Sequence, residues 1–181
     1  MGKFLDQSDQ DVHNIVTCNT YGPVLLTRQV ITGMSKRNKA LKKRSLIVFT
    51  SAMAAIAPVP NGAVYSATKI LNDFLTWGLE YELAEHSIDV MAWRAAGVST
   101  KMIGHEKPGL LTVTPEHYVA CGFAKVTSGV HSGYIGHELM HCFLTNLKDI
   151  FPSGPSLLLG KLFGHAAAKA TAGNKIDKKK K

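Results

Sequence analysis

Two short apolar runs, separated by one long amphipathic segment, constrain the fold of this chain more than any other feature. Residues 45–50 (SLIVFT) and 88–93 (IDVMAW) contain β-branched residues in continuous apolar stretches, which is typical of strands covered on both faces. Residues 64–85, between them, place apolar side chains at helical spacing. A strand, a helix and a second strand of these lengths predict a parallel sheet of α/β type.

The other helices follow from similar patterns. Residues 8–36 predict one long helix, kinked or locally tightened at Pro23 because proline cannot donate to the helical ladder. Two later helices are expected near residues 115–127 and 137–149. Only two strands are clear from the sequence, fewer than a doubly wound sheet normally has.

Positive charge is concentrated in two places. The chain of 181 residues has a formal net charge of +8, and its basic residues cluster at 36–44 and 175–181. No nucleic-acid-binding motif or interleaved aromatic run accompanies either cluster, so we expect no nucleic-acid partner. We interpret residues 36–44 as a solvated loop between two apolar segments.

Tyr65 and Lys69 form a candidate acid/base pair. They are four residues apart, slightly more than one helical turn, so both side chains project from one face of the predicted helix. An ammonium at this position favours the phenolate and is expected to lower the tyrosine pKa from its reference value near ~10. The alternative is an ordinary aromatic at a helix start with a solvated lysine nearby.

The surroundings of this pair resemble the active-site stretch of the short-chain dehydrogenase/reductases. The matching segments are LIVFTSA at residues 46–52, PVP at residues 58–60 and VYSATK at residues 64–69. Residues 114–119 and 132–137 resemble the C-terminal region of the very-long-chain 3-oxoacyl-CoA reductases and 17β-hydroxysteroid dehydrogenases. The resemblance implies an incomplete Rossmann-like, doubly wound parallel sheet that lacks the N-terminal βαβ unit with its glycine-rich turn.

The resemblance also implies roles for individual residues. Tyr65 would donate the proton to the substrate carbonyl as hydride arrives, while Lys69 would lower the Tyr65 pKa and hold the nicotinamide ribose. Asn19 would hold a water in a proton relay to Lys69, and Thr100 would contact the nicotinamide amide or the pyrophosphate. The alternatives are an ordinary polar helix residue for Asn19 and a helix N-cap for Thr100.

The sequence departs from the family pattern at three places. The active-site serine of the family lies thirteen residues before the tyrosine, and that position is Ala52. The adjacent Ser51 replaces it only if the loop is locally re-registered, because neighbouring strand residues face opposite sides. The Pro-Gly that usually follows the last core strand reads Ala95-Ala96. No G-x-x-x-G-x-G or G-x-G-x-x-G motif occurs, so the pyrophosphate lacks its usual helix N-terminus.

Residues 137–141 (HELMH) match the helical H-E-x-x-H pattern of zinc metalloproteases, which places two histidines one turn apart. No third ligand stands at a recognised spacing, and the reductase-like C-terminal region needs no metal there. We therefore expect no metal site. A zinc hydrolase built on His137 and His141 is kept as an alternative.

The C-terminal residues differ from the rest of the chain and suggest where in the cell the protein lies. We assign residues 1–150 to the reductase-like domain and residues 151–181 to an apolar segment with a lysine tail. Residues 151–172 are suited to lie along a membrane surface or to cover a hydrophobic acyl channel, or else they form a loosely ordered tail. Lys178 and Lys179 resemble a di-lysine retrieval signal, which agrees with the cytosolic face of the endoplasmic reticulum membrane. The alternative is a cytoplasmic protein.

The function predicted from these observations is that of an NADP-dependent oxidoreductase. With NADP(H) as cofactor, it would reduce the ketone of a long-chain 3-oxoacyl-CoA in fatty-acid elongation, or a steroid ketone. NADP rather than NAD is implied by the resemblance alone. The main alternative is a truncated reductase, weak or inactive as a catalyst, that acts by interaction. Family members often dimerise through the helix that carries the tyrosine and lysine, together with the helix before it, so a homodimer is also expected.

Overall fold

A three-stranded parallel sheet lies at the centre of the computed structural model, which describes residues 3–126 and 129–161. The strand order is β1-β2-β5, where β1 is Ser45–Ala52, β2 is Ile88–Ala95 and β5 is Gly129–His131. Both pairings are parallel, and β1 and β2 are matched along their whole length. The parallel sheet expected from the two apolar runs is therefore confirmed, with both expected strands two residues longer than predicted.

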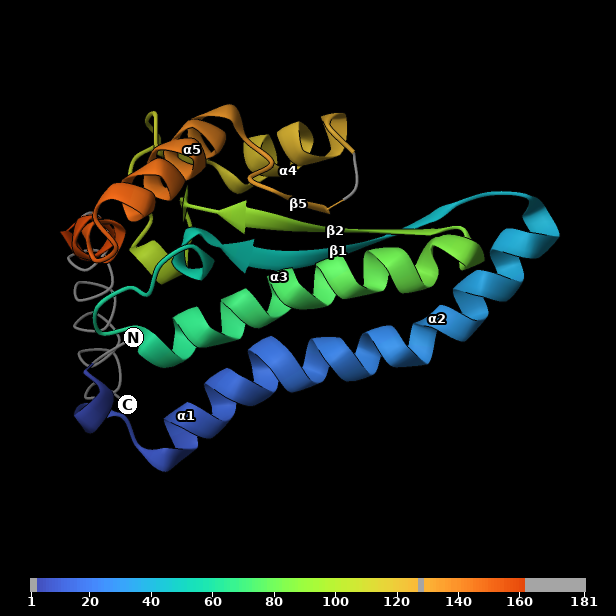
Figure 1. Ribbon diagram of the computed structural model, residues 1–181, viewed down its shortest axis with the longest axis horizontal. Helices are drawn as coiled ribbons and strands as arrows, with labels where there is room; N and C mark the ends of the chain where they lie inside the picture. The colour runs from blue at the N-terminus through green and yellow to red at the C-terminus, as the bar shows by residue number, and fades with distance from the viewer. Residues whose placement is uncertain (1–2, 127–128, 162–181) are drawn as a thin grey trace.

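Helices cover both faces of this sheet (Figure 1). On one face lie α2 (Gly22–Leu41) and α3 (Ala63–Leu83), and on the other lie α4 (Pro115–Ala124) and α5 (Ile135–Ile150). The α3, α4 and α5 helices begin and end close to their predicted bounds. This arrangement confirms the α/β class, with helices wound on both sides of a parallel sheet.

Several short elements complete the described chain. A second, two-stranded parallel sheet pairs β3 with β4, near the carboxyl end of β2. The short elements are η1 (Phe4–Asp6), η3 (Met53–Ala55), β3 (Gly97–Val98), η4 (Ala84–His86), η5 (Lys101–Ile103) and β4 (Thr112–Val113). Residues 154–161 are also helical and follow α5.

The strand β2 is buried from both sides, as its continuous apolar run predicts. Val90 and Ala92 pack with residues of α2 and α3, whereas Met91 and Trp93 pack with Tyr118 of α4. Successive side chains of a strand point to opposite faces, so one short run serves two separate cores. The sheet is thus fixed between the two helical layers, which sets where the ends of its strands lie.

The first long helix contains a wider turn instead of a proline kink. It begins as α1 (Asp9–Val16), capped by the Ser8 side chain, and passes through a π-helical turn, η2 (Thr17–Tyr21), into α2. Pro23 is the second residue of α2 and directly follows this π-helical turn, in which the Gly22 amide donates to the Thr17 carbonyl oxygen. Proline has no amide with which to continue that ladder. The helix therefore changes locally next to Pro23, but it widens at Thr17–Tyr21 where we expected a kink or a tighter turn.

The basic cluster at residues 36–44 is not the solvated loop that we expected from its charge. Most of it continues α2 as far as Leu41, five residues beyond the predicted end of the helix. Lysine and arginine are good helix formers, and the buried Asn38 anchors this end to the rest of the domain. Lys42, with φ of 52°, ends the helix in the left-handed conformation.

The end of α2 depends on the side-chain amide of Asn38. Its Nδ2 donates to the carbonyl oxygens of Ser87 (2.8 Å) and His86 (3.3 Å), and its Oδ1 accepts from the Ser45 hydroxyl (2.6 Å). The substitution Asn38→Ala removes three hydrogen bonds at a buried position. It should lower the free energy of unfolding by about 3 kcal/mol, because buried partners are left unsatisfied.

Urea unfolding followed by circular dichroism measures this change. The matched control is Gln29→Ala on the exposed side of the same helix, which should alter stability by less than about 0.5 kcal/mol. Equal effects of the two substitutions would contradict the anchoring role of Asn38.

Candidate functional site

Tyr65 and Lys69 lie together at the start of α3, beside the carboxyl end of β1. The Lys69 ammonium donates to the carbonyl oxygen of Thr50 at 2.9 Å and lies 5.5 Å from the centre of the Tyr65 ring. Lys69 is only 8% exposed, which is rare for a lysine without an ion-pair partner. The helical spacing therefore places the two side chains in contact, as the sequence predicted.

The pKa of Tyr65 is shifted in the direction opposite to the one that we expected. Burial raises the pKa of Tyr65 to about 12, whereas we expected the neighbouring ammonium to lower it. The ammonium lies over the ring and binds Thr50, so burial of the phenol decides the result. Burial also lowers the pKa of Lys69, against the opposing effects of Cys18 and Asp73. In this state the phenol is protonated at neutral pH.

Ser51 and Ala52 occupy opposite sides of β1, as neighbouring strand residues should. The pairing of β1 with β2 runs through Ala52 without interruption, so the re-registration that would let Ser51 replace the family serine is not present. The Ser51 hydroxyl is buried and donates to the main-chain carbonyl of Lys69 at 3.2 Å. Ala52 belongs to the apolar cluster against which Tyr65 packs. No hydroxyl at position 52 faces the tyrosine.

Asn19 reaches the same helix from the π-helical turn. Its Nδ2 donates to the Thr68 hydroxyl at 3.1 Å, and that hydroxyl donates to the Tyr65 carbonyl oxygen at 2.6 Å. Asn19 therefore contacts the turn of α3 that lies between the tyrosine and the lysine. Its role in a water relay to Lys69 stays a prediction.

Thr100 lies apart from the pair, between β3 and the short η5 helix. Its position is that of an N-cap, but its side chain makes no capping hydrogen bond. No hydrogen bond among the described residues joins Thr100 to Tyr65 or Lys69. Its contact with a cofactor also stays a prediction.

The turn after β2, where the family pattern has Pro-Gly, is held by a histidine. The Ala96 amide donates to Nδ1 of His137 at 3.3 Å, and Nε2 of His137 bonds the Leu111 carbonyl oxygen at 3.3 Å. His137 is fully buried, and burial lowers its pKa. Both ring nitrogens of a neutral imidazole are thus used. His137 fixes the polypeptide at the carboxyl end of the sheet.

The other members of the HELMH motif also have partners. Nε2 of His141 accepts from an Arg94 guanidinium nitrogen at 2.8 Å, and a Glu138 oxygen accepts from the Ser132 amide at 2.9 Å. No group of three potential metal ligands forms within residues 3–126 and 129–161. The described structure therefore gives the alternative of a zinc hydrolase no support.

Sequence reasoning missed a buried ion pair next to this site. Asp73, four residues after Lys69 on α3, accepts from Nε of Arg94 on β2 at 2.8 Å, and its side chain has no exposed surface. The same spacing that joined Tyr65 to Lys69 extends one more turn to Asp73. That spacing was the available signal, but Arg94 is 21 residues away from Asp73 and only the fold brings it close.

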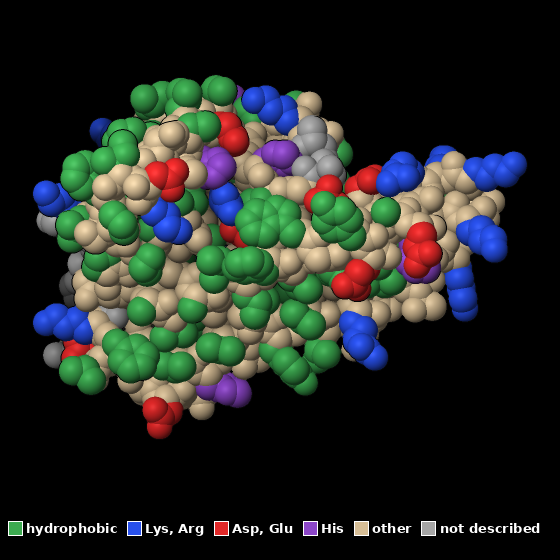
Figure 2. All heavy atoms as spheres, in the orientation of Figure 1, with side chains coloured by type: hydrophobic (Ala, Val, Ile, Leu, Met, Phe, Trp, Pro, Cys, Tyr) green, Lys and Arg blue, Asp and Glu red, His purple; other side chains and the backbone are tan. Residues whose placement is uncertain are grey.

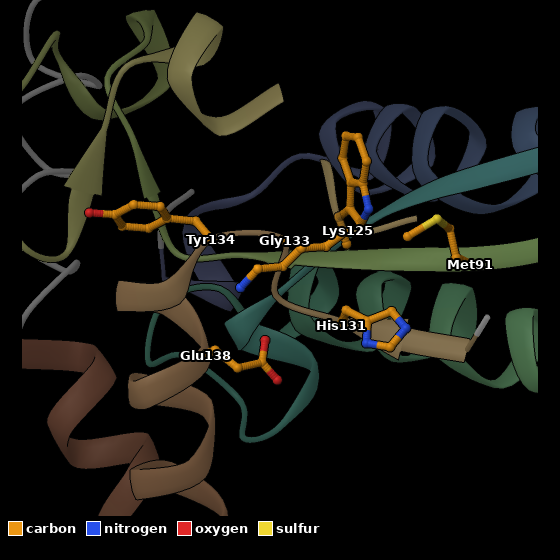
Figure 3. Close-up of a pocket in the computed structure, with 7 residues that line it drawn as sticks. Met91, Lys125, His131, Gly133, Tyr134 and Glu138 are labelled. Carbon is orange, nitrogen blue, oxygen red and sulfur yellow. The ribbon is translucent and has the colours of Figure 1, made fainter. Parts of the chain in front are cut away.

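A small cavity lies elsewhere, on the α4–α5 side of the sheet (Figure 3). It encloses about 150 Å³ and is lined by residues that include Met91, Lys125, His131 and Glu138. Lys125 and Glu138 point toward the same space from different elements. None of the expected site residues lines this cavity, so we do not assign the candidate site to it.

Sequence comparisons with a family model and with curated relatives point to the same family. A sequence model described as short chain dehydrogenase matches residues 1–110. The chain is 32% identical over 141 residues to 17-beta-hydroxysteroid dehydrogenase type 3 of Danio rerio, which covers 76% of this chain and 44% of the relative. It is 30% identical over 151 residues to the very-long-chain 3-oxoacyl-CoA reductase of Homo sapiens, covering 81% of this chain and 46% of the relative. The chain therefore spans less than half the length of these curated relatives.

Solved structures agree at the level of the fold. A short chain dehydrogenase from Burkholderia cenocepacia, solved in complex with NADP, superposes with a TM-score of 0.65. The superposition covers 84% of this chain and 62% of that protein, at 18% sequence identity. The likeness supports the Rossmann-like arrangement expected from the sequence, with part of that fold present.

Proposed function

Because the chain belongs to the short-chain dehydrogenase family, we propose that it is an oxidoreductase in which Tyr65 and Lys69 act on a substrate carbonyl. The observation that carries the proposal is the contact of these two side chains at the carboxyl end of β1. In open α/β sheets, ligands bind outside the carboxyl ends of the strands. The position of the pair at this end of the strand supports the proposal.

The free hydrogen-bonding positions of the pair fit the nicotinamide end of a dinucleotide. Lys69 donates one hydrogen bond, to Thr50, although an ammonium can donate three. The Tyr65 hydroxyl has no hydrogen-bond partner among the described residues, so it is available to a carbonyl oxygen. The phosphate end is different, since the 181 residues contain no glycine-rich turn of the dinucleotide-binding type.

The proposed mechanism is the transfer of a proton from Tyr65 to the carbonyl oxygen of the substrate. When bound, a nicotinamide dinucleotide supplies the hydride for this reaction. A phenol with a pKa of about 12 is protonated at neutral pH, which is the form needed for reduction. The nearby ammonium stabilises negative charge on the phenol oxygen once the proton leaves. Lys69 would also donate to the ribose hydroxyls.

The finer assignment rests on the curated relatives. Their names specify 3-oxoacyl-CoA reductases and a 17-beta-hydroxysteroid dehydrogenase. We propose that the substrate is the ketone of a long-chain 3-oxoacyl-CoA or of a steroid, and that the reductant is NADPH. Asn19 and Thr100 would complete the site as a water-holding residue and a cofactor contact.

Turnover of a 3-oxoacyl-CoA with NADPH tests the proposal. The purified chain should oxidise NADPH in the presence of the ketone, and Tyr65→Phe should lower kcat by about 10²- to 10⁴-fold because the proton donor is lost. The measurement is the loss of reduced-nicotinamide absorbance, with NADH and a steroid ketone as parallel substrates. The control is Tyr81→Phe, an exposed tyrosine farther along α3.

Two outcomes would count against the proposal. If neither nucleotide binds, as judged from tryptophan fluorescence and melting temperature, the chain is the weak or inactive reductase kept as the alternative. If Tyr65→Phe retains the rate of the parent chain, Tyr65 is not the proton donor.

We also propose that two copies of the chain associate through α2 and α3. Hydrophobic side chains gather along this side of the molecule (Figure 2). Leu26 is 62% exposed, and on α3 the Phe74 and Trp77 rings meet edge to face at 5.6 Å while Phe74 is 63% exposed. Contiguous exposed apolar surface of this kind is typical of an interface.

The association predicts a dimer in solution that Phe74→Glu converts to monomer, because a carboxylate would be buried in an apolar contact. Light scattering after size exclusion measures the mass. The matched control is Phe123→Glu on α4, where the phenylalanine is 55% exposed but lies on the other side of the sheet. A monomeric parent chain would contradict this proposal.

The cellular location that we propose rests on the same family resemblance. We propose the cytosolic face of the endoplasmic reticulum membrane, with the C-terminal segment as the membrane contact. Lys178, Lys179 and residues 162–172 lie outside the described residues. Among the helices that the structure describes, none has the length and apolarity needed to span a bilayer.

A further inference from the structure

The buried Lys69 and the half-buried Arg94 both lie near one buried carboxylate, that of Asp73. Lys69 is 8% exposed, and the side chain of Arg94 is 12% exposed. The only buried acidic side chain in contact with either, within the described residues, is Asp73. Buried charges are normally paired, because removing an ion from water without a partner is costly. Asp73 is bonded to Arg94 and lies one helical turn after Lys69, so its charge can act on both cations.

The fold brings Arg94 to Asp73 at the open edge of the sheet. β5 ends at His131, which pairs with Trp93 of β2. Arg94, the next residue of β2, therefore has no strand beside it on that side. The Arg94 side chain there bonds Asp73 on α3 and His141 on α5, two helices that cover opposite faces. It also lies 5.7 Å from the Trp77 ring. Arg94 thus bonds side chains from both helical layers and lies beside an aromatic ring.

Arg94 binds only one of the two carboxylate oxygens of Asp73. Its Oδ2 accepts from Arg94, whereas its Oδ1 is buried and has no hydrogen-bond partner in the part of the chain that the structure describes. Lys69 lies one helical turn before it and donates only to a neutral carbonyl oxygen. The two side chains form no direct ion pair, so the carboxylate acts on the ammonium through space in a poorly solvated region.

We propose that Asp73 is a positioning residue for Lys69, the buried counter-charge that keeps the ammonium at the start of α3, and that Arg94 limits how strongly Lys69 feels that charge. The inference deepens the proposed function, since it concerns the lysine of the same site. The charge of Lys69 itself can be measured in the isolated chain, without cofactor or substrate.

Other titratable groups around the pair are few. Tyr65 and Cys18 face Lys69 from α3 and the π-helical turn. On the far side, His141 of α5 bonds Arg94 and also interacts with Asp73. Glu138 of α5 pairs with His141, and His131 of β5 acts on Glu138. Burial lowers the pKa of Lys69, and Asp73 opposes that change, which is the direction that the proposal requires.

The test is an NMR titration of Lys69 in protein with isotope-labelled lysine, the Lys69→Arg variant identifying its signal. Asp73→Asn should lower the Lys69 pKa, because Arg94 is left as an unbalanced positive neighbour. Arg94→Gln should raise it, because Asp73 then acts on Lys69 alone. Each shift should be on the order of one pH unit. The control is Asp89→Asn, which breaks a similar ion pair with Arg44 at the opposite end of β2.

Opposite shifts in the two variants support the proposal. A purely structural role predicts another result, since either substitution would admit water and move the Lys69 pKa upward in both variants. An upward or absent shift in Asp73→Asn overturns the proposal. If that variant does not fold, Arg94→Met is compared with the double variant Asp73→Asn/Arg94→Met, and the Lys69 pKa must be lower in the double variant.

The outcome is separable from the proposed function. A chain without reductase activity still reports the Lys69 pKa, so lack of turnover leaves this test intact. In an active chain, the pH profile of the reaction should move in the same direction as the measured pKa of Lys69 in each variant.

Discussion

The pairing of β1 with β2 is the constraint on which the candidate site depends. Both strands run in the same direction with uninterrupted register, so their carboxyl ends meet at one edge of the sheet. α3 packs along both strands, and Lys69 bonds Thr50 of β1 while Asp73, one turn later, bonds Arg94 of β2. A single helix is therefore attached at two successive turns to two neighbouring strands.

This attachment explains the chemistry that the pair can perform. Tyr65 at the helix start is partly buried against an apolar cluster, and burial disfavours the charged forms of both its phenol and the Lys69 ammonium. A protonated Tyr65 is suited to give a proton to a carbonyl oxygen. The position of Ala52 in the same cluster means that the tyrosine lacks the hydroxyl neighbour found in the family pattern.

The features that the sequence predicts well are those with local causes. The two long strands follow from continuous apolar runs, α3 from its helical spacing, and the contact of Tyr65 with Lys69 from their separation by one turn. The features that it misses depend on three-dimensional surroundings. β5 is three residues long and gains its stability from pairing with β2, residues 36–41 are helical because Asn38 is anchored, and the Tyr65 pKa depends on burial. The partners of Asn19, Asp73 and His137 lie 49, 21 and 41 residues away, beyond the reach of any spacing rule.

The central claim is that burial, and not the neighbouring ammonium, controls the protonation of Tyr65. A titration of the Tyr65 ring carbon by NMR, with Tyr65→Phe to identify its signal, measures this directly. The account predicts that the phenol stays protonated until the pH approaches about 12. Ionisation at or below the ordinary value of 10.0 would contradict it, because the ammonium would then dominate the site.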